Sequence, residues 1–196
     1  MIYVIMSSDV QRNQGERSWI SKAVIYIFSA ASLSTIAGAA LGALGSLVGL
    51  SARAWLAVGF GAVAIIIGLV ELLGRQLQPL QRTRETPQSW LSLGSWRAAA
   101  LHGGSLGLGA TTRIGFWLWY VVPVGAFVSG EAIMGALIFG VYGGTRGASL
   151  VPLALSARRL GQASVGRRLL VRAGSVRRLC GAMLAIVGIA LVVGVG

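Results

Sequence analysis

Two arginines, Arg113 and Arg146, are the residues best suited to chemistry, because each lies inside an apolar stretch of the sequence. A charge inside a bilayer is costly and faces a protein interior, a cavity or the headgroups. Both follow a threonine and precede a glycine within two residues, in "TRIG" and "TRG", which leaves room around the guanidinium. Two interpretations stay open: an anion or substrate contact in a cavity, or a structural arginine that binds backbone carbonyls or reaches an interface.

Three further polar residues complete this candidate cavity or pathway. Thr111 and Thr112 bind either a ligand or the backbone at a bend. Glu131 either pairs with an arginine of another span or caps the start of a helix, where a carboxylate suits the helix dipole. The candidate set is therefore Arg113, Arg146, Thr111, Thr112 and Glu131.

Other kinds of site find little support in the sequence. The chain has one cysteine, Cys180, and one histidine, His102, so it contains no intrachain disulfide, CxxC pair or His/Cys metal cluster. The stretch "GLGLGATT" lacks the GK[ST] ending of a phosphate loop. We therefore predict a protein that is not an enzyme and has no catalytic residues, no metal and no cofactor. His102 is expected to be a packed or interfacial side chain.

The composition predicts a polytopic membrane protein. Hydrophobic residues make up 55% of the 196 residues and charged residues 11%, with a mean hydropathy of +0.77. A helix of about 20 apolar residues spans the ~30 Å hydrocarbon core. The 29 glycines suit close packing of membrane helices.

Apolar stretches divide the chain into an all-α bundle of five predicted membrane helices. Residues 1–22 form a cytoplasmic tail, residues 23–74 a first half with two spans, residues 75–97 a cytoplasmic linker, and residues 98–196 a second half with three spans. A tight turn holding Arg53 is expected between the first two spans. The stretch 98–128 is too long for one upright helix, so a tilted, broken or bent helix is expected there. Glu71 and Arg75 are predicted to form an i,i+4 ion pair at the membrane surface.

The basic residues predict the orientation. The chain has 17 lysines and arginines, and with five spans all but Arg53, Arg113 and Arg146 fall on one side of the membrane. The positive-inside rule makes this side cytoplasmic. The N-terminus is then cytoplasmic and the C-terminus outside, in a cytoplasmic (inner) membrane. The same rule accounts for the net charge of +12 without nucleic acid.

The predicted loop 156–178 concentrates positive charge without any acidic residue. It can contact anionic lipid headgroups, at about 1 kcal/mol for each basic residue, or the acidic surface of a partner. Its arginines are Arg158, Arg159, Arg167, Arg168, Arg172, Arg177 and Arg178.

Two apolar stretches, 61–74 and 181–194, share five identities in fourteen aligned positions, three of them glycines. In the predicted topology these stretches cross the membrane in opposite directions. The sequence therefore predicts a degenerate inverted repeat of two plus three helices, and such repeats place transport sites at their interface.

The glycine spacing of residues 98–115, 135–153 and 177–194, and of residues 36–74 in the first half, resembles the CcdA/DsbD transmembrane family of cytochrome c biogenesis and thiol-reductant carriers. That resemblance implies two inverted three-helix units and electron transfer through one cysteine in the first helix of each. Here residues 107–112 contain no cysteine, and a dithiol relay needs two thiols. We therefore carry over the fold and not the activity.

Two functions fit these observations. The chain is either a non-catalytic subunit or assembly factor of a larger membrane complex, or a small-solute transporter with Arg113 and Arg146 along its path. The expected partners are the lipid bilayer and its anionic headgroups, together with other membrane subunits or further copies of the chain.

Overall fold

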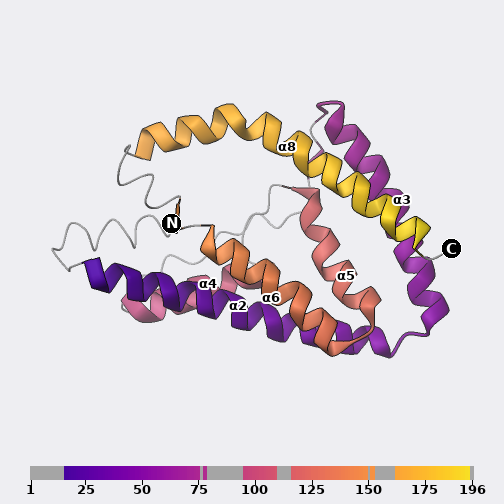
Figure 1. Ribbon diagram of the computed structural model, residues 1–196, viewed down its shortest axis with the longest axis horizontal. Helices are drawn as coiled ribbons and strands as arrows, with labels where there is room; N and C mark the ends of the chain where they lie inside the picture. Colours follow the sequence, from indigo (N-terminus) through magenta and orange to yellow (C-terminus); the bar gives the residue numbers. More distant parts are fainter. Residues whose placement is uncertain are drawn as a thin grey trace. The chain divides into compact units, whose positions relative to one another are not determined.

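The computed structural model of the protein describes residues 16–75, 77–78, 95–109, 116–149, 151–152 and 162–194. Within these ranges the chain forms helices and no strands, so the predicted all-α class is confirmed (Figure 1). The elements are α2 (Glu16–Ser46), α3 (Leu50–Leu72), α4 (Ser95–Leu108), the 3₁₀ helix η2 (Trp117–Tyr120), α5 (Val121–Ser129), α6 (Ala132–Ala148) and α8 (Gln162–Val193).

Among the residues that the structure describes, three segments are long and apolar enough to cross a membrane: Ile20–Ser46 of α2, Leu50–Leu72 of α3 and Arg172–Val193 of α8. The apolar stretch Trp117–Ser129 is shorter, and α6 has 17 residues. The membrane class predicted from composition agrees with these three helices. The count of five spans stays a prediction.

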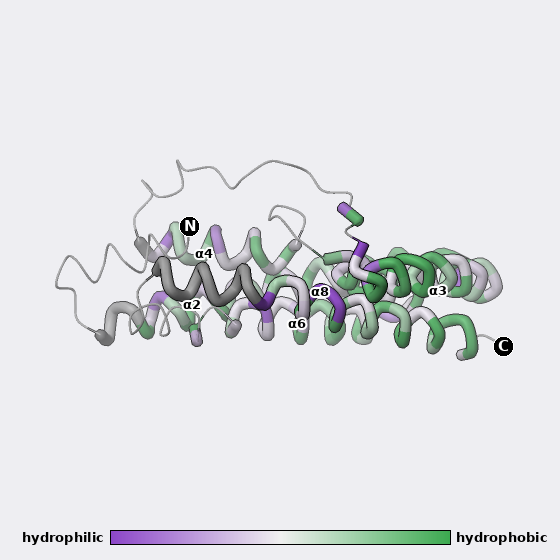
Figure 2. The backbone as a smooth tube through the Cα atoms, turned by 90° about the horizontal axis from the view of Figure 1, so that it is seen from above, coloured by the Kyte–Doolittle hydropathy of each residue, from purple (hydrophilic) through white to green (hydrophobic). Residues whose placement is uncertain are grey.

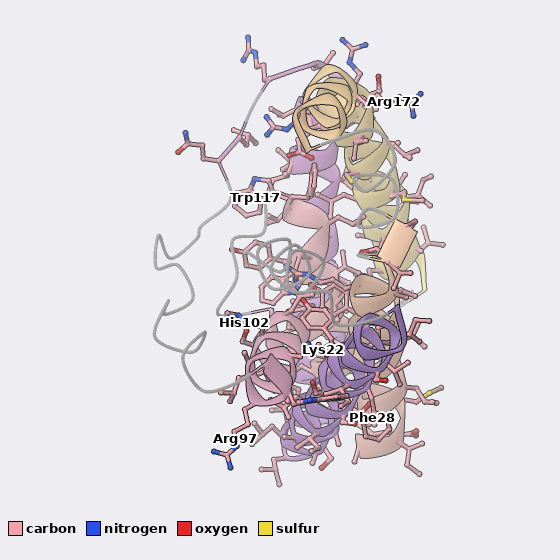
Figure 3. The ribbon with its side chains drawn as sticks, turned by 90° about the vertical axis from the view of Figure 1, so that its left-hand side faces the viewer. Lys22, Phe28, Arg97, His102, Trp117 and Arg172 are labelled. Atoms are coloured by element: carbon pink, nitrogen blue, oxygen red, sulfur yellow. The ribbon has the colours of Figure 1, made fainter. Side chains whose placement is uncertain are left out.

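Most of the buried apolar residues are alanines, and many large apolar residues are exposed. On α3 the buried positions are Ala57, Gly61, Ala64, Gly68 and Glu71, which recur every three or four residues along one face. Large apolar side chains of α2, α3 and α8 are exposed, including Phe28, Ile66 and Ile186 at 72%, 62% and 65%. Phe28 is labelled in Figure 3, and Figure 2 shows the hydrophobic residues along α3. Water would oppose this arrangement, whereas a bilayer favours it because lipid tails solvate the large side chains.

The structure moves two predicted boundaries. The turn before the second span is residues 47–49, and Arg53 lies in the first turn of α3 instead of in that turn. A tilted, broken or bent helix was expected over residues 98–128, and the structure shows the broken form: α4 ends at Leu108 and Gly109 takes a left-handed φ of 67°. The helical chain resumes with η2 and α5.

The prediction of an Arg-rich loop over residues 156–178 is wrong from Gln162 onwards. Residues 162–178 are helical and continue without a break into the apolar part of α8. Leucine, arginine and alanine favour helix, and this stretch has no proline to end it.

Contacts divide the chain into two compact units. The first contains residues 1–37, 82–113 and 140–165. In it α4 packs parallel to α2, with Gly103 against the carbonyl of Tyr26 and Gly107 against that of Ala30. The Ser29 hydroxyl donates a hydrogen bond to the carbonyl oxygen of Ala100 at 3.0 Å. The second part of α6 packs antiparallel to α2.

The second unit contains residues 38–81, 114–139 and 166–196. The remaining parts of α2 and α6 pack antiparallel there, and Gly38 and Gly135 each lie against the backbone of the other. In the same unit α3 contacts α5 and lies side by side with α8 (Figure 1).

Candidate functional site: the α3–α8 interface

Four glycines bring the backbones of α3 and α8 together. A Cβ added at Gly61 would lie 2.8 Å from the carbonyl oxygen of Gly188, and one added at Gly68 would lie 2.6 Å from that of Gly181. The same contacts hold in the other direction. A Cβ added at Gly188 would lie 2.6 Å from the carbonyl oxygen of Gly61, and one added at Gly181 would lie 2.9 Å from that of Gly68. Since Gly61 meets Gly188 and Gly68 meets Gly181, the two helices run antiparallel. The stretches that suggested a repeat are therefore the stretches that pack against each other.

At one end of this interface lies a buried acid, Glu71. Its side chain is 1% exposed, and neither carboxylate oxygen has a hydrogen-bond partner. Glu71 packs where α8 has no side chain, because a Cβ added at Gly181 would lie 2.9 Å from the Cβ of Glu71. The glycine therefore makes the space into which the acid fits.

Two polar residues of α8 face Glu71. The guanidinium of Arg177 exerts an attractive electrostatic effect on the acid, and its Nη1 is enclosed without a hydrogen-bond partner. Cys180 also lies within electrostatic range of Glu71, and its thiol is free. The α3–α8 interface therefore holds an acid, a cation and a thiol, and we call these three residues the Glu71 cluster.

The expected ion pair between Glu71 and Arg75 is wrong. Arg75 is exposed, whereas the carboxylate is enclosed, and the positive charge that acts on it belongs to Arg177. The i,i+4 rule holds within a helix, but α3 ends at Leu72 and Gly74 takes a left-handed φ of 81°, so Arg75 lies beyond the helix that carries Glu71. The sequence analysis did not predict this cluster. The feature that could have indicated it is an acidic residue, Glu71, on the same face of α3 as Gly61 and Gly68.

Arg146 is the one predicted pathway arginine that the structure describes, because residues 110–115, with Thr111, Thr112 and Arg113, lie outside the described residues. It lies in the last turn of α6, where a cation suits the helix dipole. Its guanidinium donates a hydrogen bond to the hydroxyl of Tyr142 and lies 5.6 Å from the centre of that ring.

Glu131 lies at the opposite end of α6, so the structure does not bring it together with Arg146. Its side chain is exposed, and its carbonyl accepts the first hydrogen bond of the helix from Gly135 at 2.9 Å. Glu131 therefore holds the capping position that the sequence suggested. His102, expected to be packed, is buried at 4% exposure in α4, and that expectation is confirmed.

The arginines of the predicted lipid or partner contact differ in their surroundings. Arg172 and Arg178 are exposed on α8, and Arg172 extends away from the helix in Figure 3. Arg177 is half-buried and belongs to the Glu71 cluster. Arg158 and Arg159 lie outside the described residues, and Arg167 and Arg168 lie on α8 with side chains that are not described.

One further arginine has a role that the sequence did not indicate. Arg53 reaches from α3 to the end of α5, where its Nη1 donates a hydrogen bond to the carbonyl of Val128 at 3.4 Å. Gly130 follows α5 with a left-handed φ of 63° and lies directly against the Arg53 guanidinium. Arg53 therefore caps the negative end of α5.

The described residues include no group of three His, Cys, Asp or Glu side chains able to hold a metal ion. Comparisons with protein-family models, curated proteins and solved structures found no match to the chain. The described part of the chain is all-helical, and it contains three helices that are long and apolar enough to cross a membrane.

Proposed function

We propose that the chain is a non-catalytic, multi-pass subunit or assembly factor of a larger membrane complex. In this proposal it crosses the cytoplasmic membrane five times, with its N-terminus in the cytoplasm, on a scaffold that resembles the CcdA family and lacks its redox thiols.

The observation that carries this proposal is the backbone-to-backbone packing of the helices. Gly38 and Gly135 join α2 to α6, and Gly61 and Gly188 join α3 to α8, without intervening side chains. Such contacts make a rigid scaffold and leave the large apolar side chains pointing outwards, where lipid or the helices of other subunits cover them.

Two further observations support the proposed role as a subunit. Arg146 is engaged by Tyr142 of its own helix, which is the behaviour of a structural arginine. The helix directions fit an alternating topology, since α4 runs parallel to α2, α6 runs antiparallel to α2, and α8 runs antiparallel to α3.

The test is extraction of tagged full-length protein in a gentle detergent, followed by identification of all chains that co-purify. We expect other membrane proteins in a fixed, near-integral ratio to the tagged chain. A second preparation in which the tag is on an identified partner must recover this chain in the same ratio. Recovery of this chain alone, as a monomer or homo-oligomer, would contradict the proposal.

A second candidate, a small-solute transporter, is favoured by one observation. The Glu71 cluster lies between the two helices that match in sequence, where transporters built from inverted repeats place their sites. On this alternative, Arg113→Ala or Glu71→Gln abolishes solute flux into proteoliposomes, whereas the exposed-site control Arg97→Gln leaves it unchanged. As a subunit, the chain gives no flux above empty liposomes in any of these forms.

A further inference from the structure

We propose that Glu71 is a proton-binding site between α3 and α8, at which a proton is reversibly taken up from one surface of the membrane. The proposal goes beyond the subunit function and does not depend on it, because a scaffold subunit and a transporter can both contain such a site.

The first argument is the burial of Glu71. An ionised carboxylate that is removed from water and lacks hydrogen bonds is very unfavourable, and the group responds by binding a proton or by pairing with a cation. Glu71 is 1% exposed, and neither of its oxygens accepts a hydrogen bond. Ionisable residues within membrane segments are rare for this reason, and they mark sites of ion or proton movement.

The second argument is Arg177, which gives the ionised form a partner. Its positive charge acts on Glu71 from α8, and its own Nη1 is enclosed without a hydrogen bond. Two states are then available: a neutral acid beside an unpaired arginine, and an ionised acid attracted to the arginine. A group with two such states binds and releases protons instead of holding one charge permanently.

Within the described part of the chain, few other charges surround Glu71. Arg177 and Cys180 of α8 act electrostatically on or with Glu71. Arg75, which follows the end of α3, is exposed. Helix α5, which also packs against α3, has the sequence VVPVGAFVS and contains no ionisable side chain. Arg177 is therefore the residue that sets the balance between the two states.

The chemistry of the cluster selects a proton over a metal cation. Magnesium and calcium take six or more oxygen ligands, whereas Glu71 offers two oxygens from a single carboxylate. The part of the chain that the structure describes has no group of three metal-binding side chains. A proton needs only one oxygen.

The position of Glu71 along α3 provides the path for the proton. Glu71 is the second-last residue of the helix, and the exposed residues Gly74 and Arg75 follow within one turn. At about 1.5 Å of rise per residue, the acid lies only a few ångströms from the end of the helix. Glu71 is buried by its contact with α8 and not by its depth in the membrane. A small separation of α3 from α8 therefore lets water reach the carboxyl group.

The test uses the apolar reagent dicyclohexylcarbodiimide on the full-length protein in lipid nanodiscs across a pH series. This reagent takes the proton of a neutral carboxyl group onto its nitrogen, bonds to the carboxyl oxygen and rearranges to a stable acylurea. The extent of modification at each acid is then measured by mass spectrometry of peptides. Glu131 is the internal control, because it is exposed in the same molecule.

We expect modification of Glu71 to exceed that of Glu131 at least tenfold at neutral pH, and to fall steeply as the pH rises. Modification of Glu71 that equals that of Glu131, is absent throughout, or does not change with pH would overturn the proposal.

Two arginine variants test the role assigned to Arg177. In Arg177→Gln the ionised acid loses its partner, so modification of Glu71 should persist to higher pH, by about one unit or more. In Arg178→Gln, which removes an adjacent exposed charge, the midpoint should move much less. Equal shifts in the two variants would show that the general charge of α8 controls Glu71, and the proposed pairing would be wrong.

Discussion

Gly61 of α3 and Gly188 of α8 lie backbone to backbone. A Cβ on Gly61 would come within 2.8 Å of the carbonyl oxygen of Gly188, and one on Gly188 within 2.6 Å of that of Gly61. Gly68 and Gly181 repeat this relationship one heptad away on each helix. Between them lie the small buried residues Ala64 and Ala185. The interface thus depends on the absence of side chains at fixed spacing, which predicts how substitutions should behave.

Gly188→Ala should destabilise the protein by about 1–3 kcal/mol, the usual cost of adding a methyl group to a closely packed interface. The free energy of unfolding is measured by denaturant titration in mixed micelles, followed by tryptophan fluorescence. Gly59→Ala on α3 and Gly174→Ala on α8 are the controls, since an added Cβ at either position meets nothing within 4 Å. Losses of equal size at the controls would show that helix flexibility, and not the interface, explains the effect.

Gly130→Ala should cost more than an ordinary substitution, because two effects combine. The left-handed φ of 63° disfavours a Cβ by about 1–2 kcal/mol, and the methyl group would also collide with the Arg53 guanidinium. The double variant Arg53→Ala/Gly130→Ala removes the collision and leaves the backbone strain. Unfolding free energies of the two single variants and the double variant form a cycle, in which we expect the combined loss to be smaller than the sum. Additive losses would contradict the contact.

Arg146→Ala should lower stability by about 1 kcal/mol through loss of the contacts with Tyr142 and the end of α6. Tyr142→Phe removes the hydroxyl and keeps the ring, so it should lose only part of this stability. The thermal midpoint in detergent measures both. The assembly proposal further expects Arg146→Ala to retain its partners in the pull-down; their loss from a protein that is still folded would indicate that Arg146 contacts a partner directly.

Ser29→Ala should remove the hydrogen bond from α2 to the carbonyl of Ala100 in α4. Hydrogen bonds between membrane helices contribute about 0.6 kcal/mol on average, so a loss of this order is expected. Ser46→Ala is the matched control on the same helix, because its hydroxyl bonds only to the carbonyl of Ala43 one turn back. The difference in unfolding free energy between the two variants isolates the interhelical contribution. A difference of zero would show that water or the local backbone replaces the bond.

The matching stretches 61–74 and 181–194 show where sequence reasoning and structure diverge. The sequence suggested that shared glycines record a duplication. The structure supplies a packing reason for them: two antiparallel helices in close contact need small residues at the same spacing on both, so Gly61, Gly68, Gly181 and Gly188 match whether or not they have a common origin. The inverted repeat stays a prediction.

Composition and hydropathy were sufficient to predict an all-helical membrane protein, because the cost of burying backbone groups in lipid leaves an apolar chain few alternatives to helix. The break near Leu108 was predictable from local glycine content. The helical state of residues 162–178 was not, because a basic stretch reads as a loop until its continuity with the apolar part of α8 is known.

The sequence alone thus determined the class of the protein, the spacing of its small residues and the arginine-rich start of α8, all of which depend on local composition. Only the tertiary structure decided which small faces meet and which polar residues those faces enclose. Glu71 illustrates the reason. Its i,i+4 spacing in the sequence suggested an ion pair with Arg75. In the structure, the contact of Gly68 with Gly181 encloses Glu71 beside Arg177, more than one hundred residues away in the chain. Burial depends on which helices pack together, and that choice minimises the free energy of the whole chain rather than of any one segment.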